Sequence, residues 1–268
     1  MACVDAAQEA MDSAAEKPNR AAHLVRREMK RLRALVQLAP KPRPDWMGQV
    51  ASSAGSIHRE LGELRDGCVV AATLEKVRAR HPRRWKELLP VRAPAEVLGS
   101  GKSATACAVA RGRLEELRTL IASAGRKFGS DAELGEALAR SYRKARRARA
   151  IVPTAIDQEA VHAWRKAMYR LCFQLQLAAP LLTREASKIE PGLAPLAKKL
   201  GRCGDLAMAR ERLAEREMAG VKALTRAKLL EWLGTRRQKN AHEILAATAE
   251  YFERRPRDFA KWCLRRKP

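Results

Sequence analysis

The same stretch of sequence occurs twice in this chain, at a fixed interval. HLVRREMKRLRALVQLA at 23–39 aligns without a gap with HAWRKAMYRLCFQLQLA at 162–178, and His, Arg, Met, Leu, Gln and Ala recur in register. LGELRD at 61–66 and LGRCGD at 200–205 are 139 residues apart, which is also the interval between the first two segments. Two motifs with one interval indicate an internal duplication, so we expect the chain to fold as two related halves.

Each half is expected to be helical. Ala, Leu, Arg, Glu and Lys dominate the sequence, and the alternation of Val, Ile and Thr that is typical of strands is missing. We predict an all-α protein whose halves, at about 21–150 and 158–268, are related by a pseudo-two-fold axis. Residues 1–20 are expected to be a loose N-terminal segment. The pattern predicts helices at roughly 21–39, 47–64, 67–80, 108–128, 132–150, 158–179, 194–202, 205–219 and 223–248.

The chain carries a large positive charge. Its 54 Lys and Arg residues outnumber its 30 Asp and Glu residues, which gives a formal net charge of +24. Because such an excess repels itself, we expect it to be spread over a surface that binds a polyanion: nucleic acid, an anionic membrane or an inorganic phosphate polymer. The six cysteines form no CxxC pair or zinc-ligand spacing, and no apolar stretch is long enough to span a membrane. We therefore expect a reduced, cytoplasmic protein without metal, cofactor or membrane span.

Residues 23–33 are the most basic part of the first copy. At the helical period, one face of this segment is apolar and the opposite face is cationic. The apolar face is formed by Leu24, Val25, Met29, Leu32, Leu35 and Val36. The cationic side is formed by His23, Arg26, Arg27, Lys30, Arg31 and Arg33. We therefore expect an amphipathic helix that packs on a core and presents a wall of positive charge, rather than a disordered basic tail.

The second copy repeats the histidine and several of the cations that follow it. They are His162, Arg165, Lys166 and Arg170. A single histidine beside arginines is usually an ordinary surface residue, but two copies in phase favour an anion-binding role. A neutral imidazole can donate a hydrogen bond to a phosphate oxygen, and a nearby polyanion raises the pKa of the imidazole and so favours its charged form.

Two further groups of basic residues are candidates to extend this wall. The first consists of Arg140, Arg143 and Arg147, which share one helix face, and the second of Lys199 and Arg202 with the neighbouring Lys198. The alternative for both groups is an ordinary solvated helix face.

Two other features invite a catalytic interpretation that the sequence does not support. VLGSGKSAT at 97–105 is similar to a phosphate-binding loop, but Glu96 stands where that motif needs a glycine. We expect a flexible surface loop in which Lys102 adds charge and nothing more. Asp66 and Asp205 recur in register, and we expect them to cap the helix that follows rather than to catalyse a reaction.

The basic motif, with its histidine, its duplication and the LGxxxD segment that follows each copy, resembles the CHAD family, the conserved histidine α-helical domain. The first copy fits the pattern H-x-x-R-x-x-x-[KR]-R-x-R, and HAWRK at 162–166 is similar to the family's H-x-W-R-K segment. SYRKARRA at 141–148 resembles the basic helix that precedes the second motif, and RRPRDFAKW at 254–262 resembles the C-terminal end of the domain. The resemblance covers roughly residues 20–265.

The resemblance implies one domain, at about 20–268, made of two antiparallel four-helix bundles around a central basic pore or cleft. It also implies binding of inorganic polyphosphate without catalysis, and recruitment to polyphosphate granules. The second copy departs from the pattern at Tyr169, Cys172 and Gly204, so we expect it to contribute fewer charges than the first.

The physical chemistry of a phosphate polymer agrees with this implication. A chain of phosphates has no base edges to be read and is held by arginine and lysine through charge-assisted hydrogen bonds. The main alternative is a general DNA- or RNA-binding protein, although aromatic residues make up only 4% of the chain and leave few platforms for base stacking. An enzyme acting on phosphate polymers through His23 or His162, and a phosphotransfer histidine, are further alternatives.

Overall fold

The computed structural model describes residues 1–85, 101–123, 130–153, 158–215 and 222–264, with the side chains of 63–67 and 101–103 left outside the description. Its helices are α1 (Ala2–Asp12), α2 (Pro18–Val36), α3 (Asp45–Glu60), α4 (Gly62–Arg80), α6 (Gly101–Ala122), α7 (Asp131–Ile151), α8 (Gln158–Ala178), α9 (Ile189–Glu215), α10 (Ala223–Ala247) and α11 (Pro256–Cys263). The described residues form no β-strand, only an isolated bridge between Leu182 and Leu264. The predicted all-α fold is confirmed.

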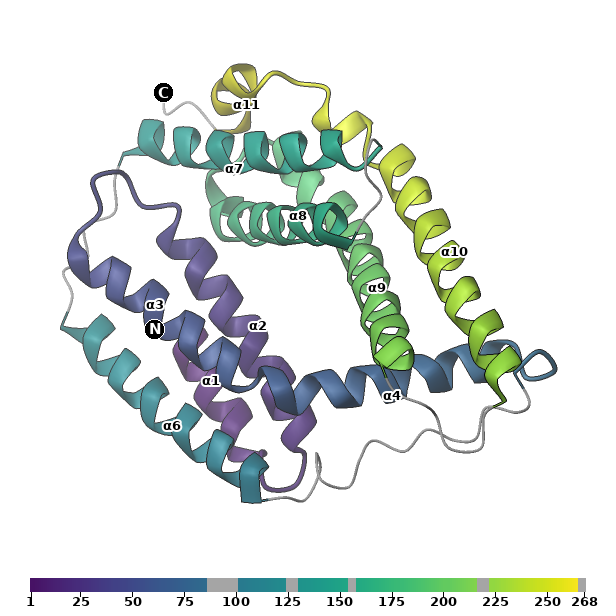
Figure 1. The fold of residues 1–268 in the computed structure, drawn as a ribbon. Helices are drawn as coiled ribbons and strands as arrows, with labels where there is room; N and C mark the ends of the chain where they lie inside the picture. The colour runs from purple at the N-terminus through teal and green to yellow at the C-terminus, as the bar shows by residue number, and fades with distance from the viewer. Residues whose placement is uncertain (86–100, 124–129, 154–157, 216–221, 265–268) are drawn as a thin grey trace.

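A first bundle is formed by α1, α2, α3 and α6, which lie together in Figure 1. As the periodicity predicted, α2 turns one apolar face inward, and Val25, Met29 and Leu32 on that face are buried. Val50 and Ile57 of α3 meet them from the other side of the same core. The cationic side of α2 is thereby directed away from the first bundle.

The N-terminal segment is part of this bundle, so the prediction of a loose segment at 1–20 is wrong. Val4, Ala7, Ala10 and Met11 of α1 are all buried against α2. These residues recur at the helical period and form a narrow apolar stripe, while the carboxylates of the segment face solvent. The stripe is short and consists largely of alanine. The acidic residues of the segment were therefore given more weight than the stripe, and a loose segment was predicted in place of a helix.

A second bundle is formed by α7, α8, α11, the first part of α9 and the end of α10. Tyr142 of α7 stacks on Phe259 of α11, with ring centroids 4.1 Å apart. The boundary predicted at residue 150 is therefore wrong, because α7 packs with the second half rather than closing the first. The duplication explains this placement: α7 precedes α8 and packs on it as α1 precedes α2 and packs on it.

A third apolar cluster joins the two bundles. α4 extends from the first bundle and lies against α9 (Figure 1), where Leu74 and Val77 pack with Leu206 and Leu213. Leu233 of α10 also belongs to this cluster. α9 thus belongs to two cores, the second bundle at its start and this cluster at its end.

The second LGxxxD segment lies inside one long helix, where the sequence predicted two helices with a break near 203. α9 continues through Gly201 and Gly204 because side chains of α8 pack over both glycines. Asp205 is therefore in the middle of a helix, and Asp66 lies within α4, so the prediction that they cap helices is wrong. Residues 101–105 likewise form the start of α6 rather than a loop, while 97–100 and the Lys102 side chain lie outside the described part.

Candidate anion-binding cleft

The cationic sides of α2 and α8 meet where the two helices pack against each other. A cleft of about 600 Å³ opens at this crossing between α2, α8, α9 and α10. Its basic lining residues are Arg26, His162, Arg165 and Arg237. The structure therefore places the +3 arginine of each copy in one cleft.

Arg26 is held at the cleft by the start of the LGxxxD helix of its own half. Its Nη1 donates a hydrogen bond of 3.0 Å to the carbonyl oxygen of His58, near the end of α3. The guanidinium lies over Gly62, where a Cβ atom would stand only 2.7 Å from Nη1. The glycine of this LG motif thus makes room for the arginine of the histidine motif.

Arg165 also lies over a glycine in the second half, three residues beyond Gly201, the counterpart of Gly62. Its guanidinium lies over Gly204 of α9, and a Cβ atom there would collide with Nη1. Gly204 stands at the position of Arg65 in the first copy, so the change that removes one charge from the LG helix opens the space that Arg165 fills. Glycine at position 204, a departure from the family pattern, therefore allows Arg165 to lie at the cleft.

Like charges approach one another across the crossing. Burial lowers the pKa of His162, and the neighbouring Lys166, Arg165 and Lys30 lower it further. Burial also lowers the pKa of Arg170, and Arg33 of α2 contributes to that shift. Lys30 and Arg33 from one copy thus face His162 and Arg170 from the other, and their charges disfavour the protonated forms of these two groups.

A buried amide fixes the crossing of the two helices. Nε2 of Gln174 on α8 donates a hydrogen bond of 3.0 Å to the carbonyl oxygen of Ala34 on α2, and the Gln174 side chain is fully buried. Within the described residues, Oε1 of this amide has no hydrogen-bond partner. Because an amide buried in this way is costly to pull apart, the hydrogen bond holds the cationic sides of α2 and α8 in a fixed register.

The model of the CHAD domain family matches residues 1–214 of this chain. The chain belongs to the CHAD domain family. The crystal structure of the CHAD domain from the plant Ricinus communis has a similar fold, with a TM-score of 0.51 and 20% sequence identity over 98% of this chain and 90% of that one. A search of curated proteins found no match. The matched region includes α1, in agreement with its place in the first bundle.

Two of the predicted site residues of this CHAD domain are turned away from the cleft. Arg27 and Arg31 form ion pairs with Glu28, at 3.0 and 3.2 Å. The Glu28 side chain is only 2% exposed, so it needs both partners to compensate for its burial. Arg27 and Arg31 therefore serve the structure of α2. Glu28 lies between them in the sequence, and this carboxylate was a signal that the sequence interpretation did not use.

The other predicted residues are spread over three places. His23, Lys166 and Arg147 are exposed on their helices, although the positive charge of Lys166 still acts on His162. Arg140 and Arg143 line a groove between α7 and α11, together with Arg257 and Lys261. Lys199 and Arg202 face a separate pocket on the other side of α9. The structure therefore does not bring these two outlying groups together with the cleft.

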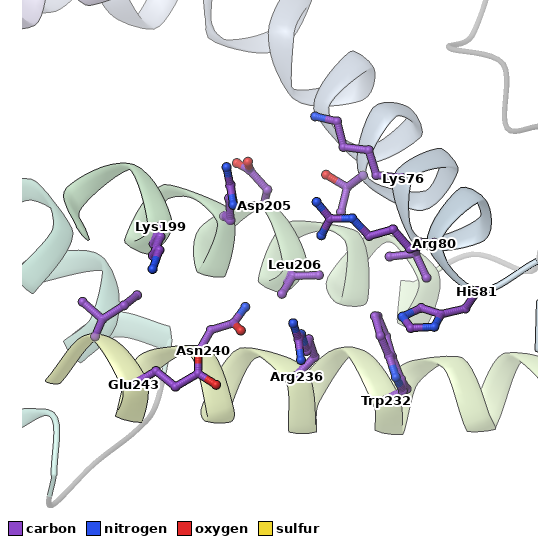
Figure 2. Close-up of a pocket in the computed structure, with 14 residues that line it drawn as sticks. Lys76, Arg80, His81, Lys199, Asp205, Leu206, Trp232, Arg236, Asn240 and Glu243 are labelled. Atoms are coloured by element: carbon purple, nitrogen blue, oxygen red, sulfur yellow. The ribbon is translucent and has the colours of Figure 1, made fainter. Parts of the chain in front are cut away.

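That separate pocket lies between α4, α9 and α10 and has a volume of about 330 Å³ (Figure 2). Besides Lys199 and Arg202, its basic lining residues are Lys76, Arg80 and Arg236. Among the lining residues of the pocket and the cleft, Asp205 alone is shared. The sequence interpretation missed Lys76, Arg80, Arg236 and the Arg237 of the cleft, because only packing reveals that their helices converge.

No described helix combines the length and the apolar character needed to cross a membrane. The same part of the chain holds no group of three or more His, Cys, Asp and Glu side chains placed to bind a metal ion.

Proposed function

We propose that this CHAD domain binds inorganic polyphosphate in the cleft between α2, α8, α9 and α10, without catalysing a reaction. The observation that supports the proposal most is the approach of like charges from the two copies of the motif. Lys30 and Arg33 face His162 and Arg170 across the helix crossing, and each of the two cations of α2 lowers a pKa on α8. A polyanion bound in the cleft beside this crossing would turn the repulsion into attraction on both sides.

The chemistry of the lining suits a phosphate chain. Guanidinium groups bind phosphate oxygens in pairs of charge-assisted hydrogen bonds, and a cleft with protein walls focuses the positive potential. The carboxylates of Glu159, Asp205 and Glu211 also line the cleft. These carboxylates would confine the bound chain to the part of the cleft where the cations of α2 and α8 meet. Binding of this kind would also bring the protein to polyphosphate granules.

The test is the binding of labelled long-chain polyphosphate across a salt series, with duplex DNA of equal total charge as competitor. A built site keeps polyphosphate at salt concentrations where DNA has dissociated, because counterion release weakens all nonspecific binding steeply. Even exchange of the two polyanions at every salt concentration would instead support general nucleic-acid binding.

The same assay separates a site from diffuse attraction. The double variant Lys30→Glu/Arg165→Glu is expected to lose polyphosphate affinity at least a hundredfold. The matched control is Arg20→Glu/Lys198→Glu, two charge reversals at exposed positions that do not line the cleft. The absence of catalysis is checked separately by measuring phosphate release from polyphosphate with Mg²⁺, Mn²⁺ or Ca²⁺; release above the protein-free rate would contradict that part of the proposal.

A further inference from the structure

The pocket between α4, α9 and α10 has a lining unlike that of the cleft. Three helix faces converge on it, each marked by residues that recur at the helical period. On α10 the face runs from Trp232 through Arg236 and Asn240 to Glu243. Figure 2 shows Trp232, His81 and Arg80 at one end of the pocket and Lys199, Asn240 and Glu243 at the other. The pocket thus has an aromatic end and a polar end.

The cations of the pocket have no carboxylate partners of their own among the described residues. In that part of the chain, Lys76, Arg80, Lys199, Arg202 and Arg236 take part in no ion pair. These five permanent positive charges share the lining with two carboxylates, those of Asp205 and Glu243. The excess of positive charge in a concave site predicts an anionic ligand.

The rest of the lining predicts that this anion carries a ring. Trp232 is only partly buried, and its ring makes T-shaped contacts with the rings of His81 and Trp85 at centroid distances of 5.4 and 6.0 Å. Val77, Leu206 and Ile244 add apolar surface. A simple phosphate chain gains nothing from an indole and three aliphatic side chains, whereas a planar base gains stacking and burial.

We propose that this pocket binds a free nucleotide, with the base at the Trp232 end and the phosphates at the cations of α9 and α10. The volume of about 330 Å³ is near the lower limit for small-molecule sites and suits one nucleotide rather than a polymer. Asn240 supplies a donor and an acceptor for the polar edge of the ligand. The site is separate from the proposed polyphosphate cleft and does not depend on it.

The proposal is tested by calorimetric titration of the full-length protein with ATP, with AMP and with tripolyphosphate, which has similar charge and no base. One ATP is expected to bind per chain, and tripolyphosphate is expected to bind at least tenfold more weakly. Trp232→Leu should lose this preference for ATP, while Trp232→Phe, which keeps a ring, should retain it. Equal affinity for ATP and tripolyphosphate, unchanged in Trp232→Leu, would overturn the proposal.

Charge variants locate the bound nucleotide. Lys199→Ala and Arg236→Ala are each expected to weaken ATP binding about tenfold, the usual effect of losing one charge-assisted hydrogen bond. Lys198→Ala removes the same charge one residue away, at an exposed position that does not line the pocket, and should leave ATP affinity unchanged. Equal losses in Lys198→Ala and Lys199→Ala would show diffuse attraction and overturn the proposal.

A cross-check separates the two sites. Arg165→Ala should weaken polyphosphate binding and leave ATP binding intact, whereas Lys199→Ala should do the reverse. Loss of ATP binding in Arg165→Ala would place the nucleotide in the cleft and refute a second site. Normal ATP binding to a protein that fails to bind polyphosphate would support the pocket while rejecting the function proposed for the cleft.

Discussion

The guanidinium of Arg165 lies in the space that a side chain on Gly204 would occupy. One residue belongs to the histidine motif and the other to the LGxxxD segment, so the contact joins the two motifs of the second half. Arg26 and Gly62 form the same kind of contact in the first half. The two contacts use different positions of the segment, since Gly62 corresponds to Gly201 and not to Gly204, but both give an arginine of the cleft a helix surface without a side chain beneath it.

Gly204→Ala is the first test of this relationship. The added methyl group would displace the Arg165 guanidinium, which is flexible enough to move, and polyphosphate affinity should fall as much as in Arg165→Ala. The double variant should lose no more than either single variant, because both changes remove the same contact. Affinity is measured by fluorescence titration. Gly112→Ala on the open surface of α6 is the control, and unchanged affinity in Gly204→Ala would contradict the positioning role.

Polyphosphate binding should strengthen as the pH falls. Burial, Lys166, Arg165 and Lys30 hold the pKa of His162 below its ordinary value in the free protein, and a bound polyanion would raise it. Binding therefore takes up a proton at pH values between the two pKa values. Above both values the imidazole is neutral in both states, and affinity no longer depends on this group.

The number of protons taken up on polyphosphate binding is measured by calorimetry in buffers of different ionisation enthalpy. The other charged groups that line the cleft, Arg26, Arg165, Arg237, Glu159, Asp205 and Glu211, are present in both the parent protein and the control variant His162→Gln. His162→Gln should abolish the proton uptake. An identical uptake in this variant would assign the proton to another group.

The stability of the free protein should rise when one cation of the crossing is removed. Arg170→Met keeps most of the aliphatic stem and ends the repulsion from Arg33. We expect the Tm to rise by roughly 2–4 °C, the change that about 1 kcal/mol produces in a domain of this size. Polyphosphate affinity should fall in the same variant, which thermal unfolding with and without the ligand would show.

The equivalent residue of the first copy provides an opposite control. Arg31 forms an ion pair with the buried Glu28, so Arg31→Met should lower the Tm rather than raise it. A rise in both variants would mean that the overall positive charge, and not the contact between Arg33 and Arg170, limits stability.

Helix α1 should contribute strongly to the stability of the first bundle. Met11 is 1% exposed, and Met11→Ala is expected to lower the free energy of unfolding by about 2–5 kcal/mol, as for other buried methionines. Urea unfolding followed by circular dichroism measures this loss. Glu9→Ala, on the exposed side of the same helix, should change stability by less than about 0.5 kcal/mol.

The sequence predicted the parts of the site that follow from local periodicity. The apolar and cationic sides of α2 depend on residues three and four apart, so the helical period alone places Arg26 and Lys30 on the cationic side. Their meeting with His162 and Arg165 could be expected from the duplication. By contrast, the ion pairs of Arg27 and Arg31 depend on how deeply Glu28 is buried, which periodicity alone does not determine.

Local periodicity could not predict that α7 belongs to the second bundle, and it could not predict the pocket of Figure 2. α7 follows the first half in the chain, and its contacts with α8 and α11 assign it to the second. The pocket combines Arg80, Arg202 and Arg236 from three helices. Each of them alone is an ordinary cation on a helix surface, and their convergence results from the long-range packing of α4 on α9.

The packing of α4 across the two bundles has a consequence for how the protein folds. Leu74 of α4 and Leu206 of α9 are far apart in the sequence, and their cluster needs both helices in place before it gains any burial. The crossing of α2 and α8 closes a loop of similar length, since Gln174 and Ala34 are 140 residues apart, so the two contacts have a similar entropic cost. Whichever contact forms first shortens the loop that the other must close, so the two bundles are expected to dock in one cooperative step in which the pocket between α4, α9 and α10 forms together with the α2–α8 crossing.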